Sequence, residues 1–161
     1  MADINRAHDD DWSLVREIRL RSLSTDPAAF GQTWDKESTY EDSVWEQRVR
    51  EAAWFLAVEE GQPVAVVAAR HEEDSPANER ELQAMWVTPT SRHGGIAAKL
   101  AEAVFDWSRE DGADTITLYV GPENTGARAL YESLGFVDTG DRWEIIEGDP
   151  DSAWLKMARG L

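Results

Sequence analysis

Residues 81–100 read ELQAMWVTPTSRHGGIAAKL, and this stretch sets the arrangement of the rest of the chain. The run from Leu82 to Val87 alternates as a strand does, and it ends at Pro89 because proline has no backbone N–H to donate to a continuing ladder. From Gly95 onward the apolar residues recur at helical spacing. The stretch therefore predicts a strand, a short loop and a helix.

The loop before this helix carries two adjacent glycines, Gly94 and Gly95. A helix that begins here offers unpaired backbone N–H groups and a positive dipole end, and the glycines let an anion approach the backbone closely. The loop is therefore a candidate phosphate site. An ordinary strand-to-helix connection with a flexible double glycine is the alternative, because short glycine patterns recur by chance.

Two motifs resemble those of the GCN5-related N-acetyltransferases, the GNAT superfamily. Arg92 to Ala97 fits R/Q-x-x-G-x-G/A, the family's acetyl-CoA pyrophosphate signature, and Val87-Thr88-Pro89 is similar to the turn that precedes it. Residues 120–136 reproduce the family's V-x-x-x-N-x-x-A-x-x-L-Y-E-x-L-G-F block. Two motifs in the right order argue against a chance match. The resemblance covers residues 53–139 well and both ends more weakly.

The resemblance implies that acetyl-CoA is the co-substrate. It also implies that the pantetheine arm pairs with the exposed edge of the central strand, in the gap where two parallel strands splay apart. The expected cofactor contacts are Met85, Trp86, Val87, Arg92, His93, Gly94, Gly95, Ile96, Ala97, Asn124 and Tyr131. No metal is expected, because three scattered histidines, no cysteine and no His-Glu cluster give no ligand spacing.

Two residues are the candidate catalytic groups. Tyr131 matches the family's hydroxyl that protonates the leaving sulfur, and Glu81 matches by position the glutamate that serves as base in some branches. Packing beside Leu130 and Leu134 is the alternative for Tyr131. For Glu81 the alternatives are that it is an ordinary exposed glutamate at a strand end, that water and an already neutral amine suffice, or that the base is His71 or His93. Asn124 could equally be a simple helix cap.

The first third of the chain is expected to form the acceptor wall. Helices are predicted over about 12–23 and 40–51, joined by an apolar segment, residues 28–34, that lacks a clear period and is interpreted as a loop. The resemblance assigns these helices and their connection to the acceptor side. The candidate substrate-contacting aromatics are therefore Phe30, Trp34 and Trp45, with ordinary core packing as the alternative.

The remaining elements complete a single mixed domain over residues 1–161. Strands are expected at 54–58, 64–69, 115–120, 136–137, 143–146 and 153–157, a helix at 125–134, and a mobile polar loop at 71–80. The strand-helix-strand order around Gly95 implies a right-handed crossover between two parallel neighbours. The predicted fold class is α/β, in the mixed α+β sense: a twisted, mostly antiparallel sheet with a parallel pair at its centre and helices on both faces.

Composition narrows the partners. The formal net charge of −16 argues against binding to nucleic acid and favours a cationic acceptor, although an acidic surface could simply maintain solubility. The apolar runs are too short to span a membrane, and the N-terminus lacks the basic start and apolar core of a signal peptide. A cytoplasmic protein is therefore expected.

These inferences combine into an acetyl-CoA-dependent N-acetyltransferase that works by direct attack within a ternary complex. The expected acceptor is a primary amine of a small cationic molecule, such as a polyamine or an aminoglycoside-type antibiotic, for which a role in resistance is conceivable. One alternative is a protein or peptide N-terminus or a lysine, which would need an open groove. Another is a non-catalytic acyl-CoA-binding sensor. A homodimer would be in keeping with the family.

Overall fold

The computed structural model describes residues 2–161, which fold around one seven-stranded sheet with the order β1-β2-β3-β4-β5-β7-β6. Only β4 and β5 run parallel among the paired strands of this part of the chain. The mixed fold with a central parallel pair is thus confirmed. The strands are β1 (Asp3–Arg6), β2 (Ala53–Glu59), β3 (Gln62–Arg70), β4 (Glu79–Val87), β5 (Thr115–Val120), β6 (Val137–Glu144) and β7 (Ala153–Gly160).

Helices cover the two faces of the sheet and bury two hydrophobic clusters. Along β2, Phe55 belongs to the cluster under α4 and α5, whereas Trp54 and Leu56 belong to the cluster under α1 and α3. This alternation arises because successive strand residues point to opposite faces. The helices are α1 (Trp12–Thr25), α2 (Trp34–Glu37), α3 (Asp42–Glu51), α4 (Ile96–Glu110) and α5 (Thr125–Ser133).

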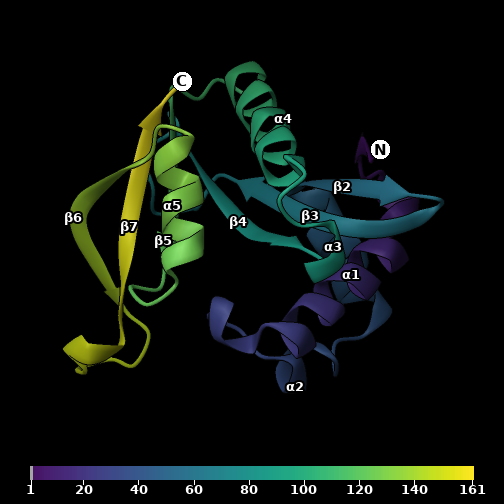
Figure 1. Ribbon diagram of the computed structural model, residues 1–161, viewed down its shortest axis with the longest axis horizontal. Helices are drawn as coiled ribbons and strands as arrows, with labels where there is room; N and C mark the ends of the chain where they lie inside the picture. Colours follow the sequence, from purple (N-terminus) through teal and green to yellow (C-terminus); the bar gives the residue numbers. More distant parts are fainter. Residues whose placement is uncertain (1) are drawn as a thin grey trace.

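The parallel pair separates after only a few residues. Backbone pairing between β4 and β5 runs from Glu79, opposite Thr115, to Glu81, opposite Thr117. Beyond that point β4 stays paired with β3 as far as Val87, so its other edge is left open. Figure 1 shows β4 and β5 diverging, with α5, β6 and β7 on one side of the gap.

A bulge bends β4 at the start of this open edge. Val66 of β3 pairs with Trp86, but Ala68 pairs with Gln83, so β4 holds one residue more than β3 over the same length. Ala84 takes up the difference with a φ of 58°, in the left-handed region that non-glycine residues rarely occupy. Such bulges turn the residues that follow and often lie beside functional sites.

The sequence interpretation was wrong about β6. Residues 136–137 and 143–146 were expected to be two short strands, but β6 runs without a break from Val137 to Glu144. All of its residues are exposed, so no apolar alternation marks it. Gly140, with a φ of 87°, lies within an irregularity in the pairing with β7. β7 itself lies between β5 and β6, so β6 is the edge strand.

The segment over residues 28–34 is also more ordered than expected. A 3-10 turn spans Pro27–Ala29, and α2 begins at Trp34 after Thr33, whose side chain accepts a hydrogen bond from the Lys36 N–H. Four residues give too little helical periodicity to recognise in a sequence. Among residues 2–161, no helix is both long enough and apolar enough to cross a membrane.

Candidate active site

A cavity of about 1060 Å³ opens where β4 and β5 separate. Its walls come from the end of β4, the loop into α4, the loop and helix after β5, and the segments 25–29 and 151–154. Its volume is that of a pocket for a sizeable ligand. All predicted cofactor contacts except Gly94 lie on its wall.

The loop between β4 and α4 has the conformation of an anion site. His93 and Gly95 adopt left-handed φ angles of 68° and 82°, and α4 begins at Ile96. Within the described chain, no side chain caps the first turn of α4, and a Cβ built on Gly95 would meet no atom within 4 Å. The first N–H groups of α4 therefore face open space that an anion could enter.

Arg92 ties this loop to two other parts of the molecule. Its Nε donates to the Val87 carbonyl at 2.9 Å, and its guanidinium donates to the Asp26 carboxylate at 2.7 Å. The indole N–H of Trp86 donates to the same Asp26 oxygen, also at 2.7 Å. Chiefly through the Trp86 bond, and then through Arg92, the pKa of Asp26 lies below its usual range despite partial burial.

Asp26 is a site residue that the sequence did not reveal. No local pattern marks it, because its partners lie 60 and 66 positions away in the sequence. In the structure it lies on the cavity wall and connects the end of α1 to the loop before α4. One carboxylate thus joins the expected acceptor side to the expected cofactor side.

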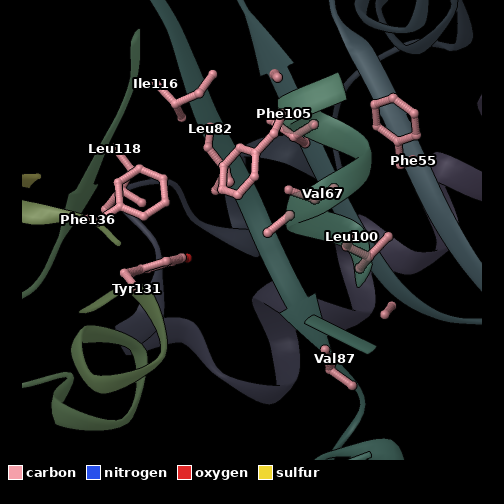
Figure 2. Close-up of a cluster of buried hydrophobic side chains, with 14 of the residues drawn as sticks. Phe55, Val67, Leu82, Val87, Leu100, Phe105, Ile116, Leu118, Tyr131 and Phe136 are labelled. Atoms are coloured by element: carbon pink, nitrogen blue, oxygen red, sulfur yellow. The ribbon is translucent and has the colours of Figure 1, made fainter. Parts of the chain in front are cut away.

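Tyr131 lies on α5 with its ring buried and its hydroxyl directed toward β4 (Figure 2). The residue is 7% exposed, lines the cavity and packs edge-to-face against Phe136 with ring centroids 5.8 Å apart. Burial raises the pKa of its phenol well above the usual value. Tyr131 therefore packs in the core and also lines the cavity, so its role as the acid stays a prediction.

Asn124 caps α5. Its side-chain oxygen accepts the Ala127 N–H at 3.3 Å, which confirms the capping interpretation. The residue also lies on the cavity wall, so its contact with a pantetheine arm stays a prediction.

Glu81 lies at the last position of β4 that pairs with β5, and it is not one of the residues that line the cavity. Its neighbour Leu82 faces the cluster under α4, so Glu81 points to the opposite face of the sheet. Gln83 donates one amide hydrogen bond to Glu81 and another, at 2.7 Å, to Glu72. Burial raises the pKa of Glu81 above its ordinary value. The structure does not bring Glu81 beside Tyr131 on the cavity wall.

The three predicted acceptor aromatics have different surroundings. Trp45 is 0% exposed and packs against the Arg48 guanidinium at 4.6 Å, so the prediction of a substrate contact was wrong and core packing is its role. Phe30 is half-buried and stacks over Arg19 at 4.9 Å, whereas Trp34 is 46% exposed. Neither Phe30 nor Trp34 lines the cavity, whose wall on this side is formed by residues 25–29.

The sequence interpretation also missed Trp154. This residue of β7 lines the cavity, and its indole lies 3.5 Å from where a Cβ of Gly121 would be. The alternation of residues 153–157 predicts that Trp154 and the buried Leu155 point to opposite faces of the sheet. The sequence does not show which of these faces borders the cavity. Among residues 2–161, no group of three histidine or acidic side chains is arranged to hold a metal ion.

Comparison with known proteins places this geometry in a family. The sequence model of the Acetyltransferase (GNAT) family matches residues 12–136. N-acetyltransferase 8 of Mus musculus is 36% identical over 100 residues, which make up 61% of this chain and 44% of that protein. The chain thus spans less than half of that relative's length.

Solved structures agree in fold. An acetyltransferase of the GNAT family from Streptococcus pneumoniae superposes with a TM-score of 0.82 at 17% identity, covering 100% of this chain and 99% of the other. The yncA protein of Salmonella typhimurium, solved with its cofactor acetyl-CoA, gives 0.78 at 17% identity, covering 100% and 94%. Because the family model matches most of this chain, the chain belongs to the acetyltransferase (GNAT) family.

Proposed function

We propose that the protein is an acetyl-CoA-dependent N-acetyltransferase. The observation that carries this proposal is the open edge of β4, which borders the cavity between the first turn of α4 and the Tyr131 side chain. Bound acetyl-CoA supplies an activated acetyl group as a thioester. The free space at Gly95 fits its diphosphate, and the cavity along β4 has room for its pantetheine arm.

Each wall of the cavity has a separate role in the reaction. The first N–H groups of α4 bind the diphosphate, and backbone N–H groups from Met85 to Val87 hold the arm and polarise the thioester carbonyl, a contribution of about 3 kcal/mol per well-aimed donor. The amine nitrogen bonds to the carbonyl carbon, and the carbon–sulfur bond breaks. The sulfur then takes a proton from the Tyr131 hydroxyl.

Glu81 is the proposed base for the proton that the amine loses. Since its side chain lies on the sheet face away from α4, it would act through water rather than by direct contact. Its raised pKa makes its carboxylate a better proton acceptor than an ordinary glutamate. An amine that arrives already neutral would need only water.

The proposed acceptor is a primary amine of a small cationic molecule, with polyamines and aminoglycosides as first candidates. A net charge of −16 attracts cations. The close approach of two segments on the acceptor side supports a small molecule over a protein. A Cβ placed on Gly31 would lie 3.6 Å from the Trp143 indole and 3.8 Å from Ile145. A peptide or lysine acceptor needs an open groove, which this contact between the segment before α2 and β6 would obstruct.

A thiol-release assay tests the proposal. The purified chain is incubated with acetyl-CoA and a panel of polyamines, aminoglycosides, simple monoamines and peptides, and acetyl-CoA binding is measured by calorimetry in parallel. Release of thiol with an amine is the expected result. Binding without release for any amine would favour the sensor alternative, and no binding would refute both.

The Gly95→Asp variant tests where the diphosphate binds. A carboxylate in the open space at Gly95 crowds and repels a diphosphate, and a side chain strains the left-handed backbone there. We expect loss of acetyl-CoA binding with the fold retained, as checked by circular dichroism. Unaltered binding would place the phosphates elsewhere.

A further inference from the structure

Three aromatic side chains share the sheet face that points away from α4 and α5. Leu118 and Leu155 face the cluster under those helices, so their neighbours Tyr119 and Trp154 point the other way. Trp143 of β6 pairs directly with Trp154 of β7, and its ring lies 5.5 Å from that of Tyr119, edge to face. We call Tyr119, Trp143 and Trp154 the aromatic face.

The aromatic face is continuous with the cavity. Trp154 belongs to both, because its indole also lines the cavity beside Gly121. Trp143 remains 45% exposed, and the segment before α2 meets its outer rim at Gly31. Figure 1 shows that segment and the β6–β7 connection at the same end of the molecule. Tyr119 and Trp143 do not line the cavity themselves, so Trp154 is the residue that connects the two surfaces.

One cation, Lys156, lies beside the aromatic face and disfavours an acceptor that carries several positive charges. Thr117 and Tyr119 are two residues apart on β5, so Glu81, paired with Thr117, points to the same face. Lys156 pairs with Tyr119 and is near enough to Glu81 to offset part of the rise in its pKa that burial causes. Since Lys156 is itself a cation on this face, a polyamine or aminoglycoside would place several like charges beside it.

We infer that the acceptor is a primary monoamine joined by a short chain to an aromatic ring, that the ring packs against Trp143 and Tyr119, and that Trp143 determines this specificity. The inference rests on the proposed function, keeps its small primary amine, and replaces polyamines and aminoglycosides as the first candidates with aromatic monoamines. An aromatic ring gains edge-to-face or offset contacts on this surface that an aliphatic polycation cannot make. The amine, at the end of its short chain, extends past Trp154 into the cavity.

Steady-state kinetics with 2-phenylethylamine, tryptamine and spermidine test the inference. We expect kcat/KM for the two aromatic amines to exceed that for spermidine about tenfold. Trp143→Ala should lower kcat/KM for the aromatic amines about tenfold and change that for spermidine less than about twofold, because only the ring loses its partner. Trp143→Phe should restore most of the preference. Val137→Ala, at an exposed residue of the same strand, is the control and should leave the ratio unchanged.

The outcomes separate this inference from the function on which it rests. If amines are acetylated but the ratio of aromatic amine to spermidine is the same in wild type and Trp143→Ala, the inference is wrong and the function stands. If no amine is acetylated, the function fails, and ligand-observed NMR of 2-phenylethylamine with both proteins still decides whether Trp143 binds the ring. A dimer that becomes a monomer in Trp143→Ala, with an unchanged ratio, would make the aromatic face a subunit interface and overturn the inference.

Discussion

The Tyr131 hydroxyl, the proposed acid, carries its proton before the reaction begins. Burial raises its pKa above the ordinary value near 10, so the phenol is neutral throughout the physiological range. We predict that Tyr131→Phe lowers kcat by about a hundredfold or more and leaves the acetyl-CoA Kd within about twofold. The ring and its contact with Phe136 are kept, so the fold should not change. Equal turnover in the thiol-release assay would remove Tyr131 as the acid.

Glu81 should impose a pH dependence on the reaction. A base works only when ionised, and burial raises the pKa of this carboxyl, so its ionisation is shifted to higher pH than for an ordinary glutamate. We predict that the kcat profile, which reports the bound complex and not the free amine, has an acidic limb with its midpoint above about 4.3, and that Glu81→Gln abolishes that limb. A variant that retained the limb at the same midpoint would assign it to another group.

The same shift of Glu81 has a consequence for stability. Between its unfolded and its higher folded pKa, the folded protein binds more protons at this site than the unfolded chain, so stability falls as pH rises through that window. Above the window the ionised carboxylate remains unfavourable. Glu81→Gln should therefore raise the denaturation midpoint at pH 7. A lower midpoint would mean that the carboxylate stabilises the fold.

At the scale of elements, α2 is held by a buried ion cluster. A helix of four residues has no stability of its own. Its Glu37, 1% exposed, accepts hydrogen bonds from the Arg19 guanidinium of α1 at 3.0 Å and from Arg48 of α3 at 2.8 Å. Burial alone would raise the pKa of Glu37, but the two arginines outweigh it and hold the pKa below its ordinary value.

Removing this carboxylate should destabilise the protein strongly. Glu37→Ala leaves Arg19, itself 5% exposed, without its partner, and we predict that the free energy of unfolding falls by about 3–5 kcal/mol in urea denaturation. Glu17→Ala, which breaks the exposed pair with Arg21, is the control and should change it by less than about 1 kcal/mol. Similar losses in the two variants would contradict the assignment of α2 to this cluster.

The elements that the sequence predicted are those with a strong local pattern. The change of period at Gly95 marks the loop and α4, and the block from Asn124 to Phe136 marks α5 and its end. β6 was predicted only as two short strands because all of its residues are exposed and follow no apolar alternation. The contacts of Asp26 could not be predicted because they join distant segments. The helical pattern around Trp45 does not distinguish a core position from one that lines a site, and the structure places this residue in the core.

At the scale of the whole molecule, the site lies between two halves of an incomplete sheet. Strands β1 to β4 and strands β5 to β7 share only the short pairing that ends at Glu81 and Thr117. The sequence resemblance implied this gap, but only the structure gives the bulge at Ala84 and the point where pairing stops. The composition carried the charge argument, whereas the aromatic face depends on the alignment of β6 and β7, which no local pattern specifies.

The separation of β4 from β5 leaves one edge of β4 unpaired, and in the proposed function the co-substrate binds along that edge. Ligand that binds only the folded chain stabilises it by about 2.7 kcal/mol when present at a hundred times its Kd. Thermal melts should therefore shift upward with acetyl-CoA and not in Gly95→Asp; a wild-type melt indifferent to acetyl-CoA would contradict this. In a cell, the fraction of unfolded protein open to proteolysis would therefore rise when acetyl-CoA is scarce, so the amount of the protein would fall together with that of its co-substrate.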